Sequence, residues 1–346
     1  MQTNNSNGKD SIVQIVRMSE IKPCRMFWIW KPYIPMRKLT ILRGDPGCGK
    51  TSFALQLAAI FSRGDIFPGQ VKEDICSENG HFQGGDVLFI SAEDDLDDSI
   101  VPRLIAANAD LDGVLSVDDS KFCGSLSFTD PKFEALIKAS NARLVIIDPI
   151  QAFIGAGVDG HRANEVRPVM SHLRYLARQY ACAIVLIEHL NKNMGGKAIY
   201  RGLGSIDITA AARSILMLGS NEKDPTQKGV AHIKSNVGQL GNVIGFNITD
   251  DGFKWDLDST ITKEAILGIS SASNGENGQS TLDKACEFLQ EVLKEDARTA
   301  RDITIMAQQF NISKTTLQRA REKLGVETIR KGFGKGSEYL WSLKEA

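Results

Sequence analysis

Short apolar runs alternate with helix-patterned stretches through the first two thirds of the chain. The apolar runs are single-strand length and occupy residues 39–42, 87–90, 144–147 and 184–187. Apolar residues recur with helical spacing in the intervening segments 51–61, 96–107, 131–140 and 163–180. This alternation predicts an α/β fold with a central, mainly parallel sheet that helices cover on both faces.

After residue 213 the pattern changes to strands joined by turns. These strands are expected at residues 214–218, 230–234, 243–248 and 252–257, and they predict an antiparallel extension of the core sheet. Residues 268–280 are rich in Gly, Ser and Asn, which is typical of a flexible linker. We therefore divide the chain into a disordered tail (1–20), a core domain (21–262), a linker (263–280) and a small C-terminal domain (281–346).

The C-terminal domain shows three helical patterns and a hairpin, the order of a winged helix-turn-helix. Its third helical pattern, 314–324, would be the recognition helix, and a basic glycine-rich tip would be the wing. From Ala297 onward, ten Lys/Arg face five Asp/Glu, an excess of five positive charges. The candidate nucleic-acid contacts are Lys314, Gln318, Arg319 and Arg321 on the helix, with Lys331 and Lys335 on the wing. Winged helices also dock proteins, so both kinds of partner stay open here.

Composition limits the remaining possibilities. The formal net charge of −1 excludes a generally basic nucleic-acid binder, so any such surface is local. The six cysteines form no CxxC pair and no cluster with histidine, which argues against disulfides and zinc sites and favours a reducing cytoplasm. No apolar run approaches the roughly 20 residues that span a bilayer, so a cytoplasmic protein without a membrane partner is expected.

A complete phosphate-binding motif follows the first strand. Residues Gly44, Asp45, Pro46, Gly47, Cys48, Gly49, Lys50 and Thr51 match GxxxxGK[ST], and Ser52 continues into the predicted helix. The glycines allow backbone N–H groups to point at phosphate oxygens, and Lys50 offers a cation to the β- and γ-phosphates. The Thr51 hydroxyl is a ligand type for Mg²⁺, so ATP and Mg²⁺ are the expected cofactors.

Two acidic positions lie where later strands end. Asp148 closes the strand 144–147 and would hold Mg²⁺ beside the phosphate loop. Glu93 follows the strand 87–90 at the same expected edge of the sheet, which makes it the candidate general base, with Asp94 assisting at the metal. The alternative is that these acidic residues only favour the N-terminus of the next helix.

These segments together resemble RecA-like AAA-type ATPases, a group related to the hexameric replicative helicases of plasmids and phages. The resemblance covers roughly residues 20 to 260. It rests on Trp30-Lys-Pro-Tyr-Ile-Pro35, the motif from Gly44 to Thr51, Ser91-Ala-Glu-Asp94, Ile147-Asp-Pro-Ile-Gln-Ala152, Glu188-His-Leu-Asn-Lys192 and Arg201-Gly-Leu-Gly-Ser-Ile-Asp-Ile-Thr-Ala-Ala-Ala-Arg213.

The resemblance implies further roles. His189 would sense the γ-phosphate, and Arg213 would be an arginine finger for a neighbouring subunit, with Lys234 as a second cation. The segment 193–204 resembles a pore loop in which Lys197, Tyr200 and Arg201 would contact single-stranded DNA. Each has a plainer alternative: a locally hydrogen-bonded histidine, exposed charges at strand ends, and a loop without a partner.

Three functions follow from these observations. The first is a ring-forming homo-oligomer, such as a hexamer, that acts as a DNA-linked replicative helicase-like ATPase of a plasmid, phage or integrated element. It would hold single-stranded DNA in its pore and duplex DNA at the winged helix. The second is an ATP-controlled DNA-binding regulator or loader that unwinds nothing. The third, a small-molecule kinase, is disfavoured by the ring features Arg213 and the pore-like segment.

Overall fold

The computed structural model describes residues 16–70, 84–117, 126–155, 163–189, 206–221, 224–249, 252–268, 281–293, 297–309, 312–331 and 338–343. The predicted nucleic-acid contacts Lys197, Tyr200, Arg201 and Lys335 lie outside these residues, and so does the side chain of Lys331.

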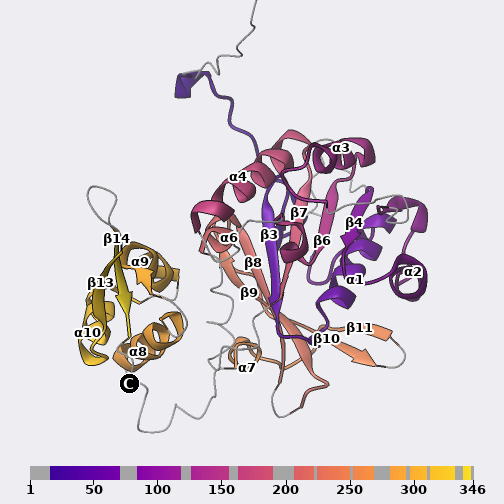
Figure 1. Cartoon of the computed structure of the whole chain (residues 1–346). Coiled ribbons are helices and arrows are strands. Elements are labelled where there is room, and N and C mark those ends of the chain that lie inside the picture. Colours follow the sequence, from indigo (N-terminus) through magenta and orange to yellow (C-terminus); the bar gives the residue numbers. More distant parts are fainter. Residues whose placement is uncertain are drawn as a thin grey trace, which may run out of the picture.

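A nine-stranded sheet forms the centre of the larger unit (Figure 1). From edge to edge its strands are β11 (Gly252–Asp256), β10 (Ile244–Thr249), β9 (Lys228–Ser235), β8 (Ser214–Ser220), β3 (Leu39–Gly44), β7 (Ala183–His189), β6 (Leu144–Asp148), β4 (Val87–Ser91) and β5 (Val114–Leu115). The six strands from β8 to β5 are parallel, whereas β9, β10 and β11 add antiparallel pairs. The predicted α/β class, with a mainly parallel sheet and an antiparallel extension, is confirmed.

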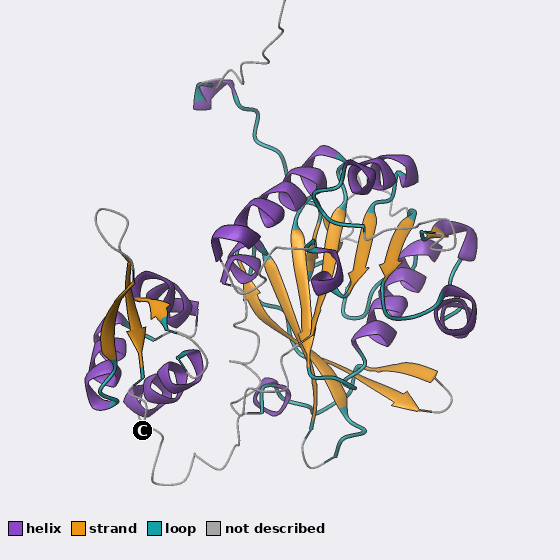
Figure 2. Ribbon diagram, viewed as in Figure 1, coloured by secondary structure: helices purple, strands orange, loops and turns teal. Residues whose placement is uncertain are grey.

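Helices cover both faces of this sheet because its strands are apolar on both sides (Figure 2). In β3, Leu42 packs on the side of α1 (Lys50–Arg63) and α2 (Val101–Ala106), while Ile41 packs on the opposite side. That opposite side carries α3 (Pro131–Ser140), α4 (Ala163–Gln179) and α6 (Ile206–Ala211). The segment predicted as one helix at 96–107 is divided into a π-helical turn, Leu96–Ile100, and α2.

An aromatic cluster joins the start of the chain to the antiparallel extension. The hairpin of β1 (Trp28–Trp30) and β2 (Ile34–Pro35) buries Trp30 completely, and its ring lies against those of Phe53 and Trp255. The Tyr33 hydroxyl donates to the Asn242 carbonyl at 2.9 Å. Burial raises the pKa of Tyr33 to about 12, so this hydroxyl stays a donor over the whole physiological range.

Residues 263–268, predicted as the start of the linker, form part of the core instead. The helix α7 (Lys263–Ile266) begins at Thr262, whose side chain accepts a hydrogen bond from the Ala265 N–H. Ile266 and Leu267 are buried against β8 and β9. The sequence pattern did not predict this helix, because only two apolar residues, Ile266 and Leu267, form its buried face.

The C-terminal residues form a separate hydrophobic core. Three helices, α8 (Thr281–Val292), α9 (Ala300–Gln309) and α10 (Lys314–Lys323), pack with a three-stranded antiparallel sheet of β12 (Arg298–Thr299), β14 (Glu338–Ser342) and β13 (Glu327–Lys331). Ser313 caps α10 by accepting from the Thr316 N–H at 3.1 Å. The three helices and the β13–β14 hairpin follow the predicted order, whereas β12 was not predicted. The assignment as a winged helix and its use for DNA binding stay predictions.

In the described part of the chain, none of the helices has both the length and the apolar character needed to cross a bilayer.

Candidate functional site

The turn between β3 and α1 takes a conformation that its glycines permit. Gly47 and Gly49 have φ angles of +79° and +93°, a region that favours glycine. A β-carbon at Gly44 would collide with the Cys48 sulfur and the Leu218 backbone, and one at Gly49 would collide with Ile248. The chain therefore wraps tightly and opens directly into the N-terminus of α1, where unpaired N–H groups favour an anion.

Lys50 lies inside this turn. Its side chain is buried, and the ammonium donates to the carbonyls of Gly44 at 2.8 Å and Asp45 at 3.0 Å. A second cation, Lys228 of β9, donates to the Gly47 carbonyl at 3.3 Å. Sequence inspection missed Lys228, because only the antiparallel register of β9 with β8 carries it to this edge of the sheet.

Thr51 and Asp148 are brought together as predicted. The Thr51 hydroxyl donates to Asp148 Oδ2 at 2.6 Å. The other carboxylate oxygen, Oδ1, is buried and has no hydrogen-bond partner. A buried, unsatisfied carboxylate oxygen beside a hydroxyl is the donor set that Mg²⁺ prefers, so these residues fit the expected metal.

Glu93, Asp148 and His189 form one group at the carboxyl ends of β4, β6 and β7. The Nε2 atom of His189 lies 3.7 Å from Glu93 Oε2 and 3.7 Å from Asp148 Oδ1. The backbone of His189 is held from the other side, since the Gln151 amide donates to its carbonyl at 3.3 Å. Glu93 is about half exposed, with 52% of its side chain accessible, so water can reach its carboxylate.

Asp94, predicted to assist at the metal, is directed elsewhere. Its carboxylate lies 3.2 Å from the guanidinium of Arg103 on α2. It is not a member of the group that Glu93, Asp148 and His189 form. The reason is local: Ser91 Oγ accepts the N–H groups of Glu93 and Asp94, which makes a tight turn after β4 and separates the two side chains.

Arg213 lies at the end of β3 opposite the phosphate loop, and Lys234 lies opposite the start of β8. The Arg213 N–H donates to the carbonyl of Leu39, the first residue of β3, whereas the phosphate loop follows the last residue of that strand. Lys234 pairs with Ile215 near the start of β8, and its ammonium donates to the Thr209 carbonyl at 2.6 Å. Burial, followed by the charges of Arg43 and Arg213, lowers the pKa of Lys234 to about 8. Neither of these contacts involves the phosphate turn, and a role for the two cations in a neighbouring copy stays a prediction.

A buried ion pair lies one residue before the site on two adjacent strands. Arg43 of β3 contacts Glu188 of β7 through its Nε atom and donates from a terminal nitrogen to the Thr209 hydroxyl at 2.6 Å. Both charged side chains are about 95% buried. Because Gly44 and His189 follow them directly, the pair fixes the spacing between the phosphate loop and the histidine.

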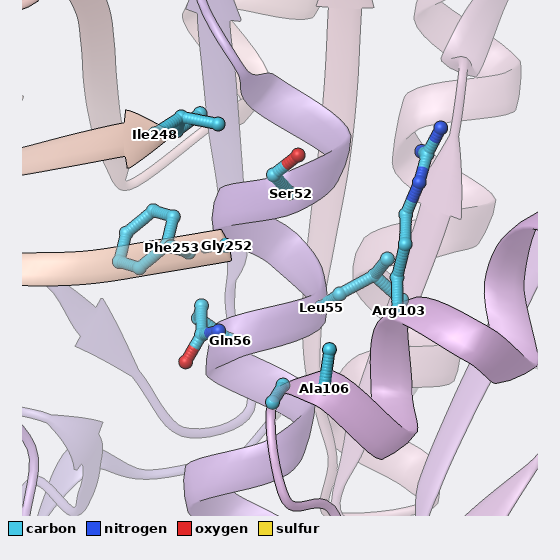
Figure 3. A pocket seen from close by; sticks show the side chains of 9 residues that line it. Ser52, Leu55, Gln56, Arg103, Ala106, Ile248, Gly252 and Phe253 are labelled. Carbon is cyan, nitrogen blue, oxygen red and sulfur yellow. The ribbon is translucent and has the colours of Figure 1, made fainter. Parts of the chain in front are cut away.

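A pocket opens beside the phosphate loop, on the exposed side of α1 (Figure 3). Its volume is about 190 Å³, below the roughly 300–1,000 Å³ of a site for a whole drug-sized ligand, so it suits part of a ligand such as a ring system. Ile248 and Phe253 of the β10–β11 hairpin line one side, Ser52 and Gln56 line its floor, and Arg103 of α2 lies across from the hairpin.

On α10, the predicted recognition helix, Arg321 makes contacts within the domain that the sequence did not predict. Lys314 and Arg319 on α10 are exposed, as a DNA contact requires. The Arg321 guanidinium instead lies over the Trp341 ring, 4.5 Å from its centroid, and donates to the Thr328 hydroxyl at 2.7 Å. Arg321 therefore stabilises the packing of α10 on the β13–β14 hairpin.

Comparison with known proteins gives the following. A sequence model of the family described as AAA domain matches residues 10–195. Among solved structures, the chain is similar to one described as an "ATPase Domain", with 16% sequence identity, coverage of 63% of this chain and 84% of that chain, and a TM-score of 0.46. The comparison with curated proteins gave no match.

Proposed function

Because this chain belongs to the AAA domain family, we propose that it binds ATP at the phosphate loop and hydrolyses it to drive a DNA-linked, replicative helicase-like motor of a plasmid, phage or integrated element. The observation that carries the proposal is the meeting of Thr51 and Asp148 at 2.6 Å beside buried Lys50, with Glu93 and His189 at the same edge of the sheet.

Each part of the proposed hydrolysis is assigned to particular residues of the chain. The turn from Gly44 to Thr51 holds the phosphates through backbone N–H groups, and the Lys50 ammonium exchanges its two carbonyl partners for phosphate oxygens. Glu93 accepts a proton from the attacking water, which its exposed carboxylate can contact. His189 lies between Glu93 and Asp148 and donates a hydrogen bond to the γ-phosphate or to that water. Thr51 and Asp148 would hold a magnesium ion, which would supply positive charge to the phosphate oxygens.

The remaining cations argue for assembly. Arg213 lies at the end of β3 opposite the phosphate loop, and Lys234 is bonded to Thr209 and not to that loop. A head-to-tail ring would present both cations to the next nucleotide. We therefore propose a homo-oligomeric ring, such as a hexamer, with ATP between subunits. Single-stranded DNA would pass through it and meet residues 193–204, and the exposed Lys314 and Arg319 would contact duplex DNA.

The pocket beside α1 is the place for the nucleobase. It opens next to Ser52, one residue after Thr51, so a nucleotide with its phosphates in the loop can extend its base there. The Phe253 ring offers a flat surface on one side, and Arg103 of α2 lines the other side of the pocket.

Replacing Phe253 with leucine is expected to raise the Kd for ATP about 3- to 10-fold, because an aromatic contact is worth roughly 0.5–1.5 kcal/mol beyond its buried area. Leucine keeps most of the volume, which limits damage to the neighbouring ring of Phe246. Calorimetry with ATP and with inorganic tripolyphosphate separates base from phosphate binding. The tripolyphosphate Kd should not change, and an equal loss for both ligands would contradict the placement of the base.

Strand displacement and ATP hydrolysis, measured together with forked and single-stranded DNA, test the whole function. The motor predicts hydrolysis that DNA stimulates and unwinding that ATP requires. Hydrolysis without unwinding of any forked substrate would favour the regulator or loader. Native mass spectrometry in the presence of ATP tests the ring, since a strict monomer would leave Arg213 without a neighbour to serve.

A further inference from the structure

Basic side chains gather near the amino-terminal ends of β3 and β8, whereas the phosphate loop follows the carboxyl-terminal end of β3. Lys38 immediately precedes β3, and Arg213 immediately precedes β8. Arg174 and Arg178 are exposed on the last turns of α4, four positions apart and therefore on one face of that helix.

Backbone hydrogen bonds bring these segments together. The Arg213 N–H donates to the Leu39 carbonyl at 2.9 Å, and the Ile184 N–H donates to the Lys38 carbonyl at 3.1 Å. Just before Ile184, the Cys182 N–H donates back to Ala177 of α4 at 3.1 Å. Lys38 is thus held between Arg213, which immediately precedes β8, and the end of α4.

The charges in this group are not compensated. Within the described ranges, no carboxylate forms an ion pair with Lys38, Arg174, Arg178 or Arg213. Burial, and after it the charges of Arg213, Arg178 and Arg174, lower the pKa of Lys38. The fold therefore holds like charges close enough to repel, a cost that a bound polyanion would relieve.

An exposed aromatic ring lies among these cations. Tyr175 comes between the two arginines on α4, and 54% of it is accessible to solvent. Its ring stacks on His172, with centroids 6.3 Å apart and planes at 21°. A fixed, exposed ring among cations suits a single-stranded nucleic acid, since stacking needs bases that a duplex hides and an acidic polypeptide lacks.

We propose that Lys38, Arg174, Tyr175 and Arg178 form a binding surface for single-stranded nucleic acid, with phosphates on the cations and a base on Tyr175. The inference deepens the proposed function, on which it rests for the choice of partner. It places a nucleic-acid contact near the amino-terminal ends of the parallel strands, away from the nucleotide at their carboxyl ends. These residues lie outside the segments predicted from the sequence to bind DNA.

Fluorescence anisotropy with a labelled oligothymidylate of about 20 nucleotides, titrated with the full chain at several salt concentrations, tests the surface. For Arg174→Gln/Arg178→Gln we expect at least tenfold weaker binding and a slope of log K against log[salt] that is smaller by about 1.4, since each lost phosphate contact removes about 0.7. For Tyr175→Ala we expect roughly 5- to 100-fold weaker binding with an unchanged slope, because stacking releases no counterions.

Lys138→Gln, an exposed cation on α3, is the matched control and should bind as the wild type does. All the altered side chains are exposed, so the melting temperature is expected to stay within about 2 °C of the wild type. Wild-type affinity and slope in the double variant, or an equal loss in Lys138→Gln, would overturn the proposal. If the arginine variant bound the oligonucleotide more weakly, Tyr175→Ala bound it normally and poly-glutamate displaced it, the surface would instead be assigned to an acidic protein partner. ATP hydrolysis and unwinding by the wild type are scored separately, so the surface can fail while the proposed function stands.

Discussion

Replacing Lys50 with methionine is expected to lower kcat/KM for ATP by about 10²- to 10³-fold, the loss that follows removal of one fixed group from a developing negative charge. The ammonium is buried within the phosphate turn, where charge interactions are stronger than in water. Methionine keeps an unbranched stem of similar size and removes the ammonium, with its charge and its N–H donors. Phosphate release in single-turnover reactions gives the measurement.

Lys228→Met is the matched comparison. This lysine also contacts the phosphate turn, at the Gly47 carbonyl, but it lies near the solvent. We expect at most about a tenfold loss, because an exposed cation is screened. Equal losses for the two lysines would mean that Lys50 has no special position and would contradict the placement of the γ-phosphate.

Glu93→Gln is expected to reduce kcat by about 10²- to 10⁴-fold, the usual contribution of a general base. The amide is nearly isosteric with the carboxylate but cannot take a proton from water. The Kd for ATP should change by less than about threefold, because Glu93 lies outside the phosphate turn and is about half exposed. Rapid-quench kinetics, with calorimetry on the same sample, separates the chemical step from binding.

Asp94→Asn and Asp95→Asn are the controls for this substitution. Asp94 pairs with Arg103, and Asp94→Asn is expected to lower kcat by less than about tenfold. Asp95 precedes the π-helical turn, and Asp95→Asn is expected to lower kcat by a smaller factor than Asp94→Asn. If Glu93→Gln kept most of its activity while Asp94→Asn lost it, the assignment of the base would be wrong.

The phosphate turn and the strand ends were predictable because their signals are local. Consecutive residues from Gly44 to Thr51 define a turn that needs positive φ angles, and an apolar run ending in Asp148 places its carboxylate at the sheet edge wherever the strand lies. The group of Glu93, Asp148 and His189 follows from one rule, that parallel strands end at a common edge.

Features that depend on register were not predictable. Lys228 reaches the phosphate turn only because β9 pairs with β8 in one alignment, and the Arg103–Asp94 contact spans the π-helical turn that runs into α2. The sequence also does not reveal that Arg43 would be buried, since an arginine next to a glycine-rich turn is more often exposed.

The pairing of Arg43 with Glu188 has a mechanical consequence. Sliding β3 past β7 by one residue would leave a guanidinium and a carboxylate unpaired in a dry environment, at a cost of about 3–5 kcal/mol. The two strands are therefore expected to move together as one rigid unit. A conformational change driven by the proposed ATP hydrolysis is then expected at the ends of these two strands, and Thr209, bonded to the same guanidinium, ties α6 to them.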